Sequence, residues 1–133
     1  MDIKIFSNNV CEVYYNAEMK VGKITWSDTP SSFEYKEPFI FLKGYIKTNP
    51  IVYFISDITN QGVNSNENRK WFEKEIIPSV IEEGIKKVAI ISNNNLLKKL
   101  YFYIMIMTLK KSDLPVRFFS NETQSIEWFK NKD

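Results

Sequence analysis

The residues of this sequence that could bind a ligand or do chemistry follow three segments predicted as strands. These segments end near residues 26, 57 and 92. In an open α/β sheet, loops and helix N-termini converge beyond the carboxyl ends of the parallel strands, and ligands bind there. We therefore take the aromatic and polar residues at these ends as ligand-binding candidates: Trp26, Asp28, Asp57, Asn60, Gln61, Asn64, Ser92, Asn93 and Asn94.

Two carboxylates in this set have the widest range of chemistry. Asp57 could serve as a general base, or it could bind a metal ion with Asp28 if the two strand ends adjoin, because hard cations need clustered oxygen ligands. The alternative is structural, since Asp, Asn and Ser at such positions mostly cap helices and close turns. We favour the structural role, and we predict no catalytic residue, no metal ion and no cofactor.

Residue types needed for common catalytic sites are missing. The chain has no histidine, which excludes imidazole-dependent serine or cysteine triads and histidine metal sites. The 4 glycines lie far apart, so no glycine-rich phosphate-binding loop is present. An enzyme would have to rely on Asp57 and the asparagine-rich edge of the sheet, which makes catalysis a less favoured hypothesis.

The single cysteine, Cys11, excludes an intrachain disulfide and any multi-cysteine metal site. An activated thiolate needs a histidine, a lysine or a helix N-terminus beside it, and none is evident nearby in the sequence. We therefore predict a small, buried or half-buried side chain at this position. A lone cysteine also fits a reducing compartment.

Charge and hydropathy narrow the partners and the location. The 18 basic and 16 acidic residues are mixed along the chain and give a net charge of +2, so we expect no binding to nucleic acid. The sequence has no N-terminal apolar segment of an export signal, and no apolar run approaches the roughly eighteen residues of a membrane span. We therefore predict a cytoplasmic protein without a membrane span.

The order of the apolar runs predicts a single α/β domain, residues 1–133. Two runs bracket a helical pattern, as in a right-handed βαβ crossover with a parallel sheet. We expect a mixed sheet of about five strands, with an N-terminal antiparallel hairpin and three parallel strands, and about four helices. The predicted extended segments are residues 3–6, 10–15, 21–26, 51–57, 87–92 and 116–119.

Capping and breaking residues define the first, third and last predicted helices. Residues 27–30 are typical of a cap before a helix that extends to about Lys47. Pro38 lies inside this helix and predicts a kink or a late start. A third helix is predicted over residues 95–111, and a last one begins at Asn121.

The second predicted helix fills the crossover between the strands at 51–57 and 87–92. Asn64 and Glu67 have the spacing of a capping box at its start. Gly84 marks its end, and Pro78 predicts a bend. A stripe at every fourth residue predicts the face that packs on the sheet: Phe72, Ile76 and Val80, flanked by Ile77 and Ile81.

The third helix is apolar on two sides. One face comprises Leu96, Leu100, Ile104 and Met107, and the nearly opposite face comprises Phe102, Met105, Ile106 and Leu109. A helix covered on both sides within the monomer would account for both faces. Monomers rarely expose apolar patches of this size. The alternative is therefore that the second face is covered by a second copy of the chain in a homodimer, by a protein partner or by a small apolar ligand.

Several aromatic and aliphatic motifs carry a resemblance to a known family. Trp26 closes a strand, Trp71-Phe72 and Ile76-Ile77-Pro78 lie on the second helix, and residues 84–89 lead into a strand. Together with Phe118-Phe119 and Glu127-Trp128-Phe129 near the end, this pattern resembles the STAS-like (SpoIIAA-like) proteins of bacteria over residues 10–130. The resemblance implies a STAS-like α/β fold related to the anti-sigma-factor antagonists, without an established activity.

The same resemblance draws attention to Ser65. Anti-sigma-factor antagonists carry a phosphorylatable serine, preceded by Asp, after the loop of the third strand. Here Asn64 stands in place of the Asp, and Asn66-Glu67 replace the small residues that usually follow. This departure makes phosphorylation of Ser65 a less favoured prediction.

Three hypotheses of function remain. The preferred one is a non-catalytic STAS-like module that binds a protein partner or a small apolar ligand and self-associates as a homodimer. The second is an enzyme that uses Asp57. The third is a regulator switched by phosphorylation of Ser65, where a phosphate at a helix N-terminus would be electrostatically favourable.

Overall fold

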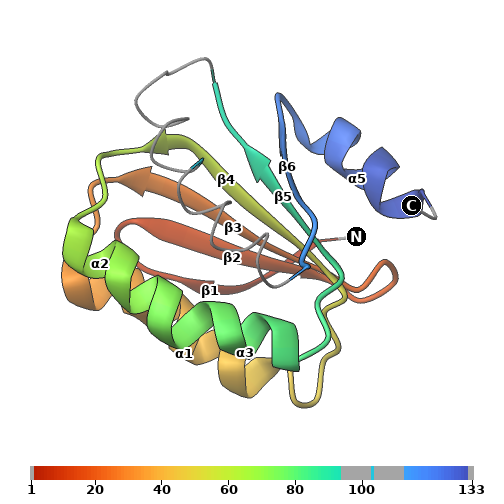
Figure 1. Ribbon diagram of the computed structural model, residues 1–133, viewed down its shortest axis with the longest axis horizontal. Coiled ribbons are helices and arrows are strands. Elements are labelled where there is room, and N and C mark those ends of the chain that lie inside the picture. Colours follow the sequence, from red (N-terminus) through yellow and green to blue (C-terminus); the bar gives the residue numbers. More distant parts are fainter. Residues whose placement is uncertain (1, 94–102, 104–112, 132–133) are drawn as a thin grey trace.

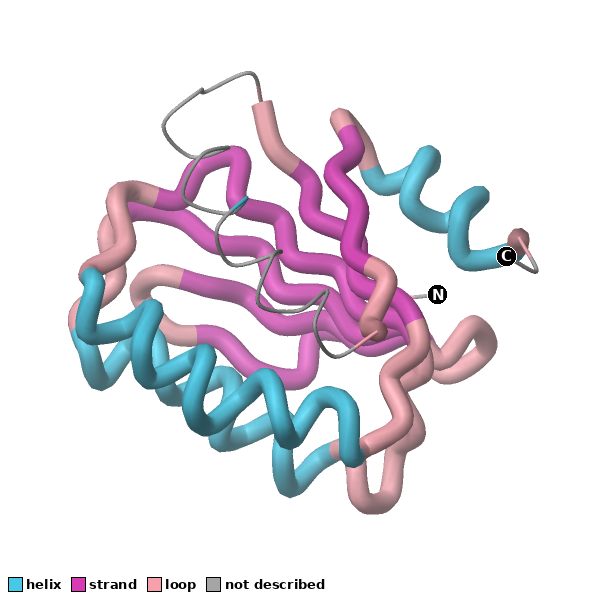
Figure 2. Tube along the Cα trace, viewed as in Figure 1, coloured by secondary structure: helices cyan, strands magenta, loops and turns pink. Residues whose placement is uncertain are grey.

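The computed structural model describes residues 2–93, 103 and 113–131 of the chain, and these residues form a six-stranded sheet with helices on both faces (Figures 1 and 2). The order of the strands in the sheet follows their order in the chain. Neighbours from β1 to β3 are antiparallel, and neighbours from β3 to β6 are parallel. The strands are β1 (Ile3–Ser7), β2 (Cys11–Asn16), β3 (Val21–Asp28), β4 (Tyr53–Gln61), β5 (Lys87–Ile91) and β6 (Val116–Phe119).

The predicted fold class is confirmed, with one strand more than expected. The segment around residues 3–6 joins the sheet as the edge strand β1, so the described part of the sheet has six strands in place of about five, and four of them are parallel. Asn8 fixes the turn after β1, because its side-chain oxygen accepts hydrogen bonds from the backbone N–H groups of Val10 (2.9 Å) and Cys11 (3.0 Å).

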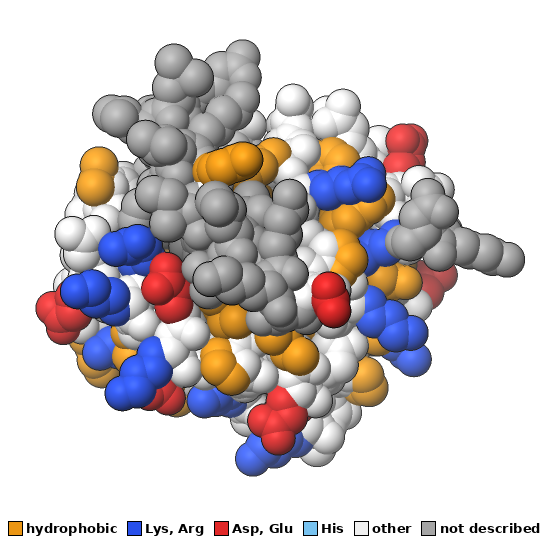
Figure 3. Space-filling model, viewed as in Figure 1, with side chains coloured by type: hydrophobic (Ala, Val, Ile, Leu, Met, Phe, Trp, Pro, Cys, Tyr) orange, Lys and Arg blue, Asp and Glu red, His pale blue; other side chains and the backbone are white. Residues whose placement is uncertain are grey.

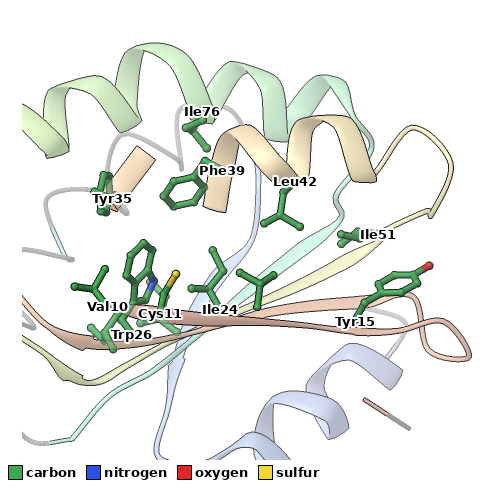
Figure 4. Packing of buried hydrophobic residues seen from close by; sticks show 13 residues of the cluster. Val10, Cys11, Tyr15, Ile24, Trp26, Tyr35, Phe39, Leu42, Ile51 and Ile76 are labelled. Carbon is green, nitrogen blue, oxygen red and sulfur yellow. The ribbon is translucent and has the colours of Figure 1, made fainter. Parts of the chain in front are cut away.

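The helices lie in two layers. The first layer covers one face of the sheet, and α5 covers the other face, as Figures 1 and 4 show. In the first layer α2, a π-helical turn and α3 follow one another as one continuous helical rod beside α1. The elements are α1 (Ser32–Tyr45), α2 (Asn66–Trp71), η1 (Phe72–Ile76), α3 (Ile77–Glu82) and α5 (Glu122–Lys130).

Both helices of the first layer begin later than their predicted caps, α2 by one residue and α1 by at least two. Ser31, and not a residue of segment 27–30, caps α1 in a full capping box with Glu34. Ser65, and not Asn64, caps α2, because the Ser65 hydroxyl accepts the N–H of Asn68 at 3.0 Å. The predicted Asn64–Glu67 capping box is therefore wrong.

The predicted bend at Pro78 takes the form of the π-helical turn η1. Proline has no N–H, so Pro78 cannot donate a hydrogen bond to the carbonyl four residues earlier. The preceding N–H, of Ile77, donates to the Phe72 carbonyl, which is the wider spacing of a π-helix. The rod then ends at Gly84 (φ 87°), where the N–H of Ile85 reaches the Val80 carbonyl at 3.4 Å, the bond that ends a Schellman motif.

The main core lies between the sheet and the first layer of helices (Figure 4). The Trp26 ring is 2% exposed and stacks on the Tyr35 ring at 5.3 Å between centroids. From the predicted stripe of the second helix, Ile76 is buried, while Phe72 and Val80 are half-buried and pack against this core. A second core, against α5, contains Val21, Ile55, Ala89, Ile91, Trp128 and Phe129.

A buried lysine fixes α5 to the sheet. Lys87 begins β5 and is 6% exposed, and its ammonium donates to the carbonyl oxygens of Trp128 and Asn131, both at 2.8 Å. These carbonyls lie at the C-terminal end of α5, where the helix dipole stabilises a cation. The ammonium also lies 5.1 Å from the centroid of the Trp128 ring.

Replacing Trp26 by alanine tests how much the first core depends on its aromatic stack. We expect Trp26→Ala to lower the free energy of unfolding by about 3–5 kcal/mol, as large-to-small changes at buried aromatic residues do. Urea denaturation gives this value. Phe33→Ala is the matched control, because that ring is 72% exposed and its loss should change the stability by less than about 0.5 kcal/mol. Equal effects of the two changes would contradict the packing.

Candidate functional site

The pairing of β3 with β4 shifts by one residue near the carboxyl ends of both strands. Thr25 pairs with Asp57, but Ser27 pairs with Asn60, so β4 contains one extra residue. This β-bulge lies within a strand that continues past the predicted end at Asp57, as far as Gln61. Because side chains of a strand alternate between the two faces, one extra residue reverses which side chains face the helices.

The bulge separates the sequence-predicted residues of β4 onto two faces. Ser56 and Ile58, before or within the bulge, line the face below α1 and α3, while Ile55 belongs to the core against α5. By alternation, Asp57 lies on the same face as Ile55. Beyond the bulge, the odd-numbered Gln61 lies on the face below α1 and α3, where its side chain is 4% exposed.

A cavity of about 120 Å³ lies between the sheet and the first layer of helices. Its walls come from β3, β4 and β5 on one side and from α1, η1 and α3 on the other, in the layer that Figure 4 shows. Aromatic and aliphatic side chains make most of the wall. Its central apolar lining includes Trp26, Tyr35, Phe39, Phe54, Ile58, Phe72, Ile76, Val88 and Ile90.

One end of this cavity is formed by side-chain amides. Gln61 and Asn64, 4% and 8% exposed, line it next to the start of α2. Behind them Asn68, 1% exposed, donates from its side-chain nitrogen to the Asn64 side-chain oxygen at 2.9 Å. The Asn68 side-chain oxygen is buried and has no hydrogen-bond partner. We call these three residues the amide cluster.

Gly62 holds the backbone of this cluster close to the loop after β3. A Cβ atom at residue 62 would lie 2.1 Å from the Thr29 hydroxyl oxygen and 3.1 Å from the Thr29 Cα. The Gly62 N–H donates to the Asp28 carbonyl oxygen at 2.8 Å. Only glycine permits this approach, so the position of the loop between Gln61 and Asn64 depends on it.

The sequence-predicted carboxylates each bind their own loop. The Asp57 side chain accepts the N–H of Thr59 at 3.1 Å, and the Asp28 side chain accepts the N–H of Thr29 at 2.8 Å. Register places Asp57 opposite Thr25, and Asp28 opposite Gln61, so the two carboxylates stand at different levels of the sheet. Over the described ranges, no group of three or more residues with metal-binding side chains is found.

The other sequence-predicted candidates take separate positions. Trp26 lies in the core and contributes its ring to the cavity wall. Asn60 and Asn93 are exposed, while Ser92 is buried and its hydroxyl donates to the Asn93 carbonyl oxygen at 2.9 Å. Asn94 lies outside the described residues. Of the nine candidates, the structure brings Trp26, Gln61 and Asn64 together around one space.

Asn68 did not enter the sequence-based candidates, although the sequence contains a signal for it. It lies four residues after Asn64 and four before Phe72, so it continues the stripe of Phe72, Ile76 and Val80. An amide at a position that packs on the sheet departs from the apolar pattern of that stripe. Such a departure marks a buried polar side chain that needs a partner.

Ser65 and the second face of the predicted third helix complete the set of predicted sites. Ser65 is exposed and caps α2, and its phosphorylation stays a prediction. Helix 95–111 and its partner face lie outside the described residues, apart from residue 103, so the homodimer also stays a prediction. The residues of that face are Phe102, Met105, Ile106 and Leu109.

Comparison with known proteins identifies the architecture. No family model matches the chain, and no curated protein matches it. Among solved structures, an uncharacterized protein from the DUF3478 family with a SpoIIAA-like fold, from Shewanella loihica PV-4, aligns with a TM-score of 0.62 over 97% of this chain and 92% of that one. The chain has a SpoIIAA-like fold.

The SpoIIAA-like fold confirms the resemblance read from the packing motifs of the sequence. At 16% identity, the alignment concerns the architecture alone. Within the described residues, no helix has the length and apolar character needed to cross a bilayer. On the face in Figure 3, basic and acidic side chains are interspersed, as expected from their mixture along the chain.

Ser65→Ala tests the structural role of this serine. The change removes the side-chain acceptor for the Asn68 N–H and should lower the free energy of unfolding by about 1 kcal/mol. Ser65→Asp keeps an acceptor and places a negative charge at a helix N-terminus, so its stability should match the wild type. Ser27→Ala, an exposed serine that caps no helix, is the control in urea denaturation. Equal losses in the alanine and aspartate variants would contradict the cap.

Cys11 is predicted to resist alkylation in the folded protein. The side chain is 2% exposed, and burial raises the pKa of its thiol to about 12. An unfolded chain loses this proton near pH 8.5, so the free energy of unfolding should fall as the pH rises from about 8.5 towards 12. At pH 8, intact-mass measurement should find no iodoacetamide adduct on the folded chain and full modification in urea. Rapid modification without urea would refute the burial.

Proposed function

We propose that this chain is a non-catalytic binding module that holds a small apolar ligand between its sheet and the helices α1 and α3. The observation that carries the proposal is the cavity of about 120 Å³, whose walls are mainly aromatic and aliphatic. Side chains in protein cores normally interdigitate and leave few voids larger than a water molecule. A space of this size in a domain of 133 residues therefore suits a ligand better than a fully packed core.

The volume limits the size of the ligand. An apolar cavity of about 150 Å³ stays free of water and binds benzene. The cavity here is of the same order, so it suits a single ring or a short branched chain. A long acyl chain would need a larger space in these walls.

A binding role accounts better than catalysis for the groups around the cavity. Its described lining contains no cysteine, no aspartate and no histidine, and its ionisable side chains are Tyr35, Lys43 and Glu83. Asp57, the residue of the enzyme hypothesis, binds its own loop on the opposite face of the sheet. The cavity thus offers shape and hydrogen bonds in place of a nucleophile or a positioned base.

The remaining parts of the proposal rest on the sequence. A cytoplasmic location agrees with the lone cysteine and the mixed charge. A protein partner, or a second copy of the chain through Phe102, Met105, Ile106 and Leu109, is compatible with a ligand in the cavity. Such a module would signal the presence of its ligand by changing the surface that the partner meets.

Filling the cavity tests the proposed function. Val88 lies on β5 in the cavity wall, and Val88→Phe should occupy the space that a ligand needs. Toluene, used as a probe at about tenfold its dissociation constant, should raise the melting temperature of the wild type by about 4 °C. It should leave the melting temperature of Val88→Phe unchanged.

The matched control is Val63→Phe, which adds the same ring at a side chain that is 81% exposed. This variant should bind toluene as the wild type does. Amide chemical shifts of residues in the cavity wall, followed during the titration, locate the probe. Absence of binding to the wild type, or equal binding by Val88→Phe, would contradict a ligand site in this cavity.

A further inference from the structure

We propose that the amide cluster of Gln61, Asn64 and Asn68 selects the ligand, so that the cavity takes a small apolar molecule that carries one uncharged, amide-like group at its end. The inference rests on the proposed function, since it assigns the chemistry of the ligand in that same cavity. The polar group would meet the cluster at the start of α2, and the apolar part would lie along the aromatic wall.

The cluster has more hydrogen-bonding groups than the protein uses. Each Asn or Gln side chain carries two donor hydrogens and an oxygen with two lone pairs. Between the three residues the structure gives one side-chain hydrogen bond, from Asn68 to Asn64. The Asn68 side-chain oxygen is buried without a partner, but Asn68 stands behind the wall and does not itself line the cavity. Gln61 lines the cavity at 4% exposure, and no side-chain hydrogen bond of its amide to another described residue is found. Buried polar groups in native proteins nearly always have partners, so a group from outside the chain fits this end.

The unused groups include both donors and acceptors. Asn64 lines the cavity and retains the hydrogens of its amide nitrogen, while Asn68 behind it donates to the Asn64 oxygen and so orients that amide. The Gln61 side chain carries a donor, its amide nitrogen, and an acceptor, its carbonyl oxygen, and it offers both whichever way the amide is turned. A ligand group that both donates and accepts, as a primary amide or a lactam does, is complementary to this set. A hydrocarbon of equal size would leave the set unpaired.

Charge at this end of the cavity favours an uncharged group. The acidic and basic side chains in the described wall are Glu83 and Lys43, at the C-terminal ends of α3 and α1, away from the start of α2. Arg69 follows Asn68 on α2 and does not line the space. One terminal nitrogen of its guanidinium lies 4.0 Å from Glu73, and its Nε is buried without a hydrogen-bond partner. An ionised ligand group would lose its hydration beside the amides without gaining a counter-ion.

The positions of the amides are fixed by the backbone. The β-bulge turns Gln61 towards the helices, and the contact of Gly62 with Thr29 sets the path of the chain to Asn64. Asn68 is held on α2, whose first turn is capped by Ser65. A site whose hydrogen-bonding groups are fixed in place discriminates strongly against a ligand that lacks the matching group.

Three probes of similar shape test the selection: benzamide, benzoate and isopropylbenzene. Isothermal titration and amide chemical shifts should show that the wild type binds benzamide at least tenfold more tightly than either of the others. Gln61→Leu should remove this preference over isopropylbenzene. Asn60→Leu, the same kind of change on an exposed neighbour in β4, should keep it. Asn64→Leu, which changes the other amide of the cavity wall, provides a second variant if Gln61→Leu does not fold.

Each outcome separates the two proposals. Equal binding of benzamide and isopropylbenzene by the wild type, or an unchanged preference in Gln61→Leu, would overturn the role of the amide cluster and leave the cavity as a ligand site. Tightest binding of benzoate would overturn the choice of an uncharged group. Binding of none of the three probes, nor of toluene, would overturn the proposed function itself.

Discussion

The one-residue shift in the pairing of β3 with β4 is the constraint on which the rest of the site depends. With regular alternation, Gln61 would follow Ile55 and Asp57 towards α5. The extra residue turns it towards α1 and α3 and carries the chain on to Asn64. The bulge thus places a polar end on a space that the parallel strands otherwise line with aliphatic and aromatic side chains. The bulge lies beside the cavity, and bulges are over-represented next to functional sites.

The two faces of the sheet are covered in different ways. Against α5, aromatic rings close the layer, and Lys87 bonds to carbonyls at the end of that helix. Against α1 and α3, the π-helical turn that precedes Pro78 interrupts the regular spacing of side chains along the rod. Irregular helical turns of this kind are frequent at functional sites. The cavity between the sheet and the first layer of helices lies beneath this π-helical turn, and Phe72 and Ile76 form part of its wall.

Sequence patterns predicted most of the fold, because alternation and helical stripes record which face is buried. The apolar runs located β3, β4, β5 and β6, and the stripe of Phe72, Ile76 and Val80 located the rod. The bulge could not be predicted, since no glycine or proline marks residues 57–61. The burial of Lys87 could not be predicted from the sequence either, because the carbonyl groups that its ammonium bonds lie 41 and 44 residues further along the chain. The cap of α2 differed from its prediction by one residue because Asn64 and Ser65 are both good caps.

The amide cluster places polar side chains at buried positions where apolar side chains are expected. Asn68 occupies a position that the stripe reserves for an apolar side chain, and Gln61 is buried at the end of a strand. Consistent sequences avoid buried polar groups without partners, and natural proteins depart from this mainly at functional sites. A leucine at position 68 would also remove the donor to the Asn64 oxygen, so the amides depend on one another. The proposed ligand role rests on these side chains, because the architecture of the fold alone specifies no chemistry.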